Sequence, residues 1–256
     1  MKGKRWHENS ELSGWVFEPG SGGSMSLEVL IAVHGISRNV DEMLRATLPL
    51  ARKLDMCLLV PNFDKERFPR YQTLGAKPGQ PRPDLALNRL LLRVWPEHRL
   101  RLHLFGFSGG AQFCHRYAMF WSDRIATQTL VSAGWYTCPD LSQSYPLGLG
   151  KIPKAFPPLI DPVDYTKIPT QVLVGGKDTE RQPSLRQTPE IDAMQGYNRK
   201  QRAIHWHQQW QKRYPSSQWR IGVLEDVGHD FWVCASESNM LFQTAQFLKN
   251  EVEYAF

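Results

Sequence analysis

Residues 104–110 read LFGFSGG and place Ser108 at the centre of a G-x-S-x-G frame. An apolar run precedes the frame, as in a buried strand, and apolar residues at helical spacing follow it over residues 111–121. A serine in such a strand-to-helix turn has a strained backbone, and a Cβ at Gly106 or Gly110 would collide with the adjacent strand or helix. The stretch therefore predicts a nucleophilic Ser108 lifted clear of a buried sheet.

Around this turn, short apolar runs alternate with longer amphipathic stretches. This alternation is typical of an α/β protein with a mainly parallel sheet and helices on both faces. With 256 residues, 41% of them hydrophobic, we expect one domain over residues 1–256. The expected strands are 14–17, 27–33, 57–61, 101–107, 127–133, 171–174 and 219–224. The expected helices lie near 41–54, 84–94, 109–121, 197–213 and 236–252, with Asp41, Asp84 and Ser236 where N-caps would be useful.

A nucleophilic serine needs a base that takes its proton, and a histidine held by a carboxylate does this. His229 comes directly after the strand expected at 219–224 and before the last helix. The other histidines compared fall inside an expected strand or helix, and they are His103, His115, His205 and His207. Position therefore favours His229 as the base.

The carboxylate is expected one strand earlier, at Asp178, which follows the glycines that end the run 171–174. The chain order is then Ser108, Asp178, His229, which differs from the two common protease orders. Asp140, Asp161 and Asp164 remain alternatives, because some hydrolases place the acid after the preceding strand.

An oxyanion formed at this serine needs two backbone N–H donors. Gly109, the residue after the nucleophile, supplies one, and Ile36 is expected to supply the second from the turn after strand 27–33. We expect the side chain of His34 to support this turn. Arg38 and Asn39 either touch the substrate or fix the turn, and the sequence does not separate these roles.

Two segments rich in proline, glycine and aromatic residues, 62–83 and 134–169, are too long for simple connections. We interpret them as walls over the site, with 134–169 forming a small cap or lid inserted in the domain. The candidate substrate-binding residues are Phe63, Tyr71, Trp135 and Tyr136. Phe63 ends a strand at the catalytic face, and Trp135 and Tyr136 follow another strand at that face. The alternative is that these aromatics anchor the two loops to the sheet.

The formal net charge is +6, with the excess concentrated between residues 181 and 220. This segment mixes basic and aromatic residues, but residues recur in it at helical spacing, namely Tyr197, Ile204, His207 or Trp206, Trp210 and Tyr214. A buried helical stripe with a solvated basic back is therefore favoured over nucleic-acid binding. The role of the basic residues stays open.

No run of about 18 apolar residues and no export signal occurs, so we expect no membrane span and a cytoplasmic location, or a secreted one if a signal peptide was removed. Cys57 and Cys114 fall in different core elements and are expected to stay reduced. A bridge between Cys138 and Cys234 remains open, because both are expected in loops on the same face.

The elements H34-G35-I36-S37-R38-N39, G106-F107-S108-G109-G110, Asp178 and G228-H229 together resemble the α/β-hydrolase superfamily over nearly the whole chain. The first of these, with the run 109–117, resembles the polyhydroxybutyrate depolymerase and feruloyl esterase-like group. The resemblance implies a cofactor-free, metal-free serine esterase acting on a small-molecule or oligomeric ester, with Ser108, Asp178 and His229 catalytic and Ile36 and Gly109 as oxyanion donors. A peptidase, a thioesterase and an inactive binding module on the same fold are the alternatives, and the oligomeric state stays unknown.

Overall fold

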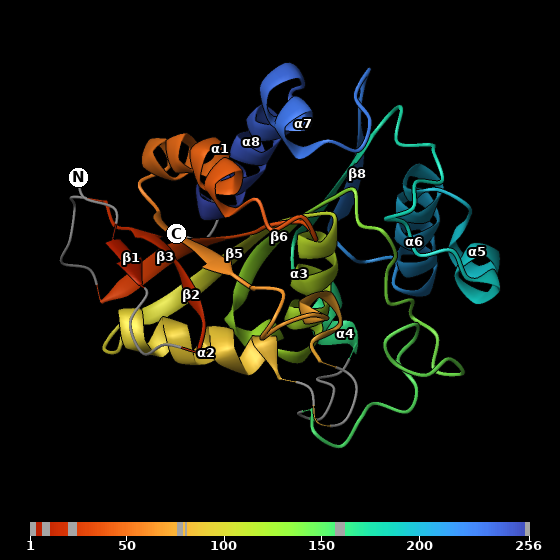
Figure 1. Cartoon of the computed structure of the whole chain (residues 1–256), viewed down its shortest axis with the longest axis horizontal. Helices are drawn as coiled ribbons and strands as arrows, with labels where there is room; N and C mark the ends of the chain where they lie inside the picture. Colours follow the sequence, from red (N-terminus) through yellow and green to blue (C-terminus); the bar gives the residue numbers. More distant parts are fainter. Residues whose placement is uncertain are drawn as a thin grey trace.

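The structure is a computed structural model that describes residues 4–6, 11–19, 25–75, 79, 81–156 and 162–253. Among these residues, eight strands form one sheet in the order β1-β2-β4-β3-β5-β6-β7-β8 (Figure 1). Strands β3 to β8 run parallel, whereas β1 and β2 join antiparallel at one edge. The strands are β1 (Lys4–Trp6), β2 (Ser13–Phe17), β3 (Ser26–Val33), β4 (Cys57–Asn62), β5 (Arg99–Phe107), β6 (Ile125–Val131), β7 (Thr170–Gly175) and β8 (Trp219–Leu224).

Helices cover both faces of this sheet. On one face lie α1, α7 and α8, and on the other lie α2, α3 and α6 (Figure 1). The helices are α1 (Val40–Lys53), α2 (Pro83–Val94), α3 (Gly109–Phe120), α4 (Pro162–Thr166), α5 (Pro189–Gln195), α6 (Arg199–Arg213), α7 (Phe231–Glu237) and α8 (Met240–Glu253), with 3-10 turns η1 (Tyr71–Thr73) and η2 (Ser122–Arg124). The predicted mainly parallel sheet with helices on both faces is therefore confirmed.

The order of the strands creates a crevice at the edge where they end. From β3 the chain passes to β4 on one side and returns to β5 on the other side of β3. The loops that follow β3 and β5 therefore diverge, and ligands bind at such switch points in parallel sheets. The loop after β3 begins with His34, and the turn after β5 carries Ser108.

The last predicted helix, 236–252, corresponds to α8, whereas α7, which ends at Glu237, was not predicted. The chain is extended at Ser238, whose hydroxyl donates to the Cys234 carbonyl and accepts from the Met240 amide. A side chain that bonds to nearby backbone in this way competes with helix continuation. The N-cap predictions were also wrong: Ser236 lies inside α7, and Asp41 and Asp84 lie in the first turns of α1 and α2, after the caps.

Helix α6 accounts for the aromatic residues of the basic segment. Trp206 and Trp210 are fully buried, and Trp206 stacks on Tyr136 with ring centroids 4.5 Å apart. The predicted buried stripe is confirmed for these tryptophans and wrong for Tyr197, which is 62% exposed. The basic back is only partly solvated, because Arg199 and Arg202 are buried.

The segment 134–156 is irregular, with an isolated bridge between Ser144 and Gly150, and it leads towards α4. Pro157 and Pro158 lie outside the described residues, and the assignment of 134–169 as a cap stays a prediction. All four cysteines are buried and free, so Cys138 and Cys234 are not bridged. Within the described ranges, no helix is both long and apolar enough to cross a membrane, and no group of three or more His, Cys, Asp or Glu side chains is placed to hold a metal ion.

Candidate active site

Ser108 lies in the turn between β5 and α3 with a backbone φ of 54°. A positive φ is strained for a serine, so the surrounding chain must hold it there. A Cβ built on Gly110 would lie 2.0 Å from the Val33 oxygen, and one on Gly106 would lie 2.5 Å from the Gly110 carbonyl carbon. The predicted collisions at both glycines are confirmed. Only residues without side chains allow helix α3 to start this close to β3 and β5.

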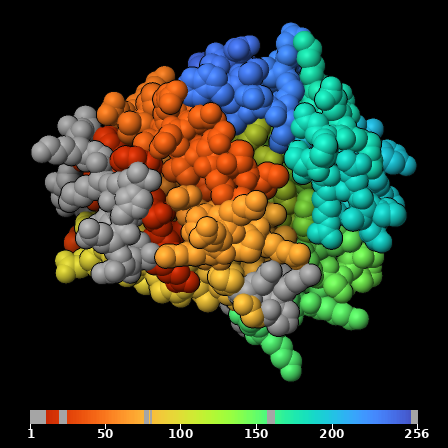
Figure 2. Space-filling view, viewed as in Figure 1, coloured from red at the N-terminus to blue at the C-terminus, as the bar shows by residue number. Residues whose placement is uncertain are grey.

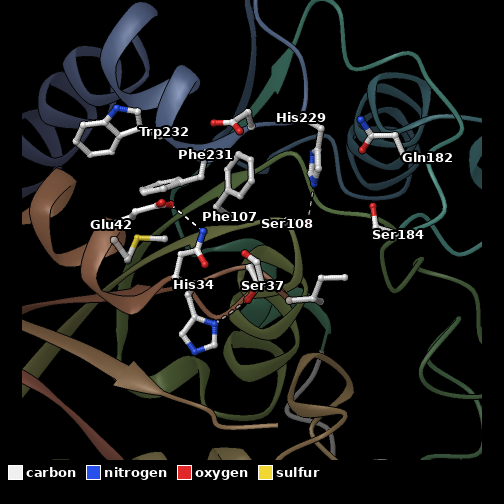
Figure 3. Close-up of a pocket in the computed structure, with 15 residues that line it drawn as sticks. His34, Ser37, Glu42, Phe107, Ser108, Gln182, Ser184, His229, Phe231 and Trp232 are labelled. Carbon is white, nitrogen blue, oxygen red and sulfur yellow. Dashed lines mark hydrogen bonds between the residues drawn. The ribbon is translucent and has the colours of Figure 1, made fainter.

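A chain of hydrogen bonds links Ser108 to a histidine and an aspartate from two other loops. His229 Nε2 lies 3.0 Å from Ser108 Oγ (Figure 3), and His229 Nδ1 lies 2.8 Å from Asp178 Oδ2. The carboxylate can only accept when ionised, so Nδ1 carries the proton and Nε2 is free to accept from the serine. The Phe107 ring stacks on the imidazole with centroids 5.1 Å apart and holds its plane.

The structure separates Asp178 from its competitors. Asp178 is 2% exposed at the end of β7, whereas Asp140 accepts hydrogen bonds from Ser142 and Asp164 pairs with Lys167. Neither of these two is bonded to a histidine, and Asp161 lies outside the described residues. Among the described aspartates, Asp178 is therefore the one placed to orient His229.

The backbone nitrogen of Ile36 lies close to Gly109, the residue after Ser108. A Cβ built on Gly109 would lie 3.3 Å from the Ile36 nitrogen. The Gly35 carbonyl accepts from the Arg38 amide at 3.0 Å and from His34 Nδ1 at 2.8 Å. These two hydrogen bonds fix the direction of the Gly35 C=O. The Ile36 N–H belongs to the same trans peptide and points the opposite way, so its direction is fixed as well. In the described part of the chain, neither the Ile36 amide nor the Gly109 amide donates to a backbone carbonyl.

Buried side chains hold this turn from behind. His34 Nε2 accepts from the Phe63 amide at 3.1 Å, and the Tyr71 hydroxyl donates to the His34 carbonyl at 2.7 Å. Burial lowers the pKa of His34 to about 4, so its ring is neutral near pH 7. Arg38 donates to the Phe63 and Ile36 carbonyls. His34 and Arg38 thus fix the turn, whereas Asn39 faces a cavity and bonds to Glu42.

Ser108 opens into a cavity of about 340 Å³. Figure 3 shows Glu42 and Trp232 on one side of it and Gln182 and Ser184 on the other, with His229 between them. Three parts of the chain that are distant in sequence form the rim, coloured orange, turquoise and blue in Figure 2. Among the described residues that line it, Glu42 and Asp230 carry negative charge and none is Lys or Arg.

The four aromatics predicted to bind substrate do not line this cavity. Phe63, Tyr71 and Tyr136 have no exposed surface and Trp135 has 5%. Phe63 and Tyr71 stack on one another with centroids 5.1 Å apart, and Trp135 lies between the guanidinium groups of Arg116 and Arg186. Phe63, Trp135 and Tyr136 follow strands as predicted, and Tyr71 opens η1, but all four rings turn inward, where they lose more water-exposed apolar surface.

The aromatic walls are instead Phe107, Phe231 and Trp232, which the sequence reasoning missed. A signal was present, because Phe231 and Trp232 follow His229 by two and three positions. Residues directly after the base open α7 at the edge of the site and cannot lie far from the serine.

Several solved structures with the same overall architecture have hydrolase or depolymerase names. Poly(aspartic acid) hydrolase-1 from Sphingomonas sp. KT-1 is similar with a TM-score of 0.75 and 24% identity, over 96% of this chain and 97% of that chain. LpqC, a poly(3-hydroxybutyrate) depolymerase from Bordetella parapertussis, gives 0.73 and 23%, over 97% and 93%. An S-formylglutathione hydrolase from Agrobacterium tumefaciens gives 0.61 and 11%, over 96% and 94%.

The chain therefore has the α/β-hydrolase fold, and the predicted fold is confirmed. At identities of 24% or less, these similarities concern the fold. No protein-family model and no curated protein matches the sequence.

Proposed function

We propose that this protein is a serine esterase that cleaves carboxylic esters through an acyl-enzyme. The observation that carries the proposal is the continuous hydrogen-bond chain from Asp178 through His229 to Ser108, with contacts of 2.8 and 3.0 Å. An aspartate, an imidazole and a hydroxyl in this order are the groups that general-base activation of a serine requires. The depolymerase and esterase names among the similar folds agree with it.

In the first half of the reaction, Ser108 Oγ attacks the ester carbonyl while His229 Nε2 takes its proton. The carbonyl oxygen becomes an oxyanion, which the N–H groups of Ile36 and Gly109 stabilise. His229 then gives its proton to the departing alkoxide, the C–O bond breaks, and the alcohol leaves an acyl group on Ser108. Water repeats the sequence with His229 as base, and the acid and free serine are released.

The charge of the cavity favours an uncharged ester. Glu42 and Asp230 are the charged side chains among its described lining residues, and both are acidic. A polyanionic chain would meet two carboxylates and no Lys or Arg among the described lining residues, which costs electrostatic energy. We therefore expect neutral esters to be hydrolysed in preference to anionic polymers such as poly(aspartic acid).

The test is hydrolysis of p-nitrophenyl acetate by Ser108→Ala. We expect kcat/KM to fall by roughly 10⁴-fold, because the nucleophile is removed. Ser132→Ala is the matched control, since Ser132 also follows a strand with a positive φ of 48° but has no contact with His229. It should keep wild-type turnover. Wild-type activity in Ser108→Ala would contradict the proposal.

A further inference from the structure

The buried arginine Arg199 contacts the same aspartate that orients His229. Its Nη1 lies 3.4 Å from Asp178 Oδ1, and the two side chains are 1% and 2% exposed. Oδ2 of the same carboxylate binds His229. Asp178 thus lies between a permanent cation and the proposed base, each on its own oxygen.

The position of Arg199 in α6 explains how it reaches the site. It is the first residue of the helix, and side chains of a helix tilt towards its N-terminus, so the guanidinium extends past the helix start. The Lys200 amide donates to the Asp178 carbonyl at 3.2 Å, which fixes the helix start against the loop after β7. The second arm, Arg199 Nη2, donates to Ser184 Oγ at 3.0 Å, and Ser184 lines the cavity.

This placement carries two costs. A cation at a helix N-terminus opposes the helix dipole, and burial lowers the pKa of Arg199 by penalising its charged form. The Asp178 carboxylate offsets both costs. Arg199 in turn stabilises Asp178. Without Arg199 this buried anion would have only an uncharged imidazole beside it, and its negative charge would favour binding of a proton to the Asp178–His229 pair.

We propose that Arg199 is a positioning residue for the reaction: it balances the charge of Asp178 and keeps this carboxylate directed at His229. This rests on the proposed esterase function. The guanidinium also joins Asp178 to Ser184, so the acid and the cavity wall form one rigid unit.

Other charged groups near this pair have hydrogen-bond or ion-pair partners of their own. Arg202, one turn later in α6, pairs with Asp192 of α5 at 2.8 Å, and Lys200 Nζ donates to the Gly176 carbonyl. Asp230 accepts the Val233 amide at the start of α7. Replacing Arg199 by a neutral residue therefore removes the positive charge bound to Asp178 without freeing another.

The experiment measures kcat/KM for ethyl butyrate by pH-stat titration between pH 5 and 10. In Arg199→Met and Arg199→Gln, protonation of His229 becomes easier, so the acid limb of the profile should move up by about one pH unit. Activity near pH 5, below the limb, should fall by about tenfold and largely return at pH 9. Arg199→Lys keeps the charge and should keep the wild-type limb within a few tenths of a unit.

Arg202→Met is the matched control, because it removes an equally buried arginine and its ion pair from the same helix without touching Asp178. It should lower Tm and leave the acid limb in place. If Arg199→Met does not fold, the comparison of Arg199→Gln with Arg199→Lys decides. A wild-type limb in the neutral variants, or an equal shift in the lysine variant, would overturn the inference. The proposed function would still stand as long as Ser108→Ala is inactive.

Discussion

Two groups of aromatic side chains follow the strand ends, and they differ in where their rings lie. Phe107, Phe231 and Trp232 line the cavity at Ser108, and Trp232 is 38% exposed. Phe63, Tyr71, Trp135 and Tyr136 lie below the surface, packed on α3, α6 and the turn after β3. A strand end therefore fixes the position of the backbone, whereas packing against the neighbouring helices determines the direction of each ring.

The largest effect we expect from this comparison is on stability. Trp135→Ala removes a nearly buried indole that lies 4.1 Å from the Arg116 guanidinium and 5.2 Å from that of Arg186. Large-to-small changes of this kind cost about 3–5 kcal/mol, so Tm should fall by several degrees. The ratio of kcat/KM for p-nitrophenyl benzoate over acetate should stay unchanged, because the ring does not reach the cavity.

Trp232→Ala is the counterpart on the cavity side. Its Tm should change little, and the benzoate to acetate ratio should fall by about tenfold, because an apolar wall is lost from the substrate site. Thermal melts and the two kcat/KM values, measured on both variants, check the pair. The distinction between the two aromatic groups fails if Trp135→Ala alters selectivity while Trp232→Ala does not.

A smaller effect on stability is expected in acid from His34, which packs against the buried rings of Phe63 and Tyr71. Burial lowers the pKa of His34 from 6.5 to about 4, so the unfolded chain binds a proton at His34 before the folded protein does. The stability from His34 is complete above pH 6.5 and is lost as the pH falls towards 4. Between pH 6.5 and 5 the loss is about 2 kcal/mol.

Chemical denaturation at pH 7.5 and pH 5.0 measures this loss. His34→Gln can still accept from the Phe63 amide and donate to the Gly35 carbonyl, but it does not titrate, so its loss in acid should be smaller than that of the wild type by about 2 kcal/mol. Buried His115, whose pKa burial also lowers, remains in both proteins and cancels in the comparison. Equal losses in the two proteins would show that His34 does not titrate as a buried group.

The sequence predicted the features that depend on chain order and on excluded volume. The glycines around Ser108 and the apolar runs were sufficient for the turn and the sheet, because few residues fit those positions. Asp178 and His229 could be placed from the sequence because the loops that follow parallel strands meet at one edge of the sheet. Those assignments agree with the hydrogen bonds at Ser108, and the catalytic roles stay proposals.

The sequence could not predict features that depend on side-chain direction. Periodicity alone did not distinguish Arg199, which folds onto Asp178, from the solvated cations of the same helix. It also started the last helix at residue 236, inside α7, because the hydrogen bonds of Ser238 that separate α7 from α8 involve the backbone of its neighbours.

The most direct test of the central claim is covalent labelling with a fluorophosphonate, followed by intact mass and peptide mapping. An activated serine attacks phosphorus and displaces fluoride, which leaves a stable adduct. We predict one adduct per chain, on Ser108, and none in Ser108→Ala. No adduct on the folded wild-type protein, or an adduct on a different residue, would contradict the claim that Ser108 is the nucleophile.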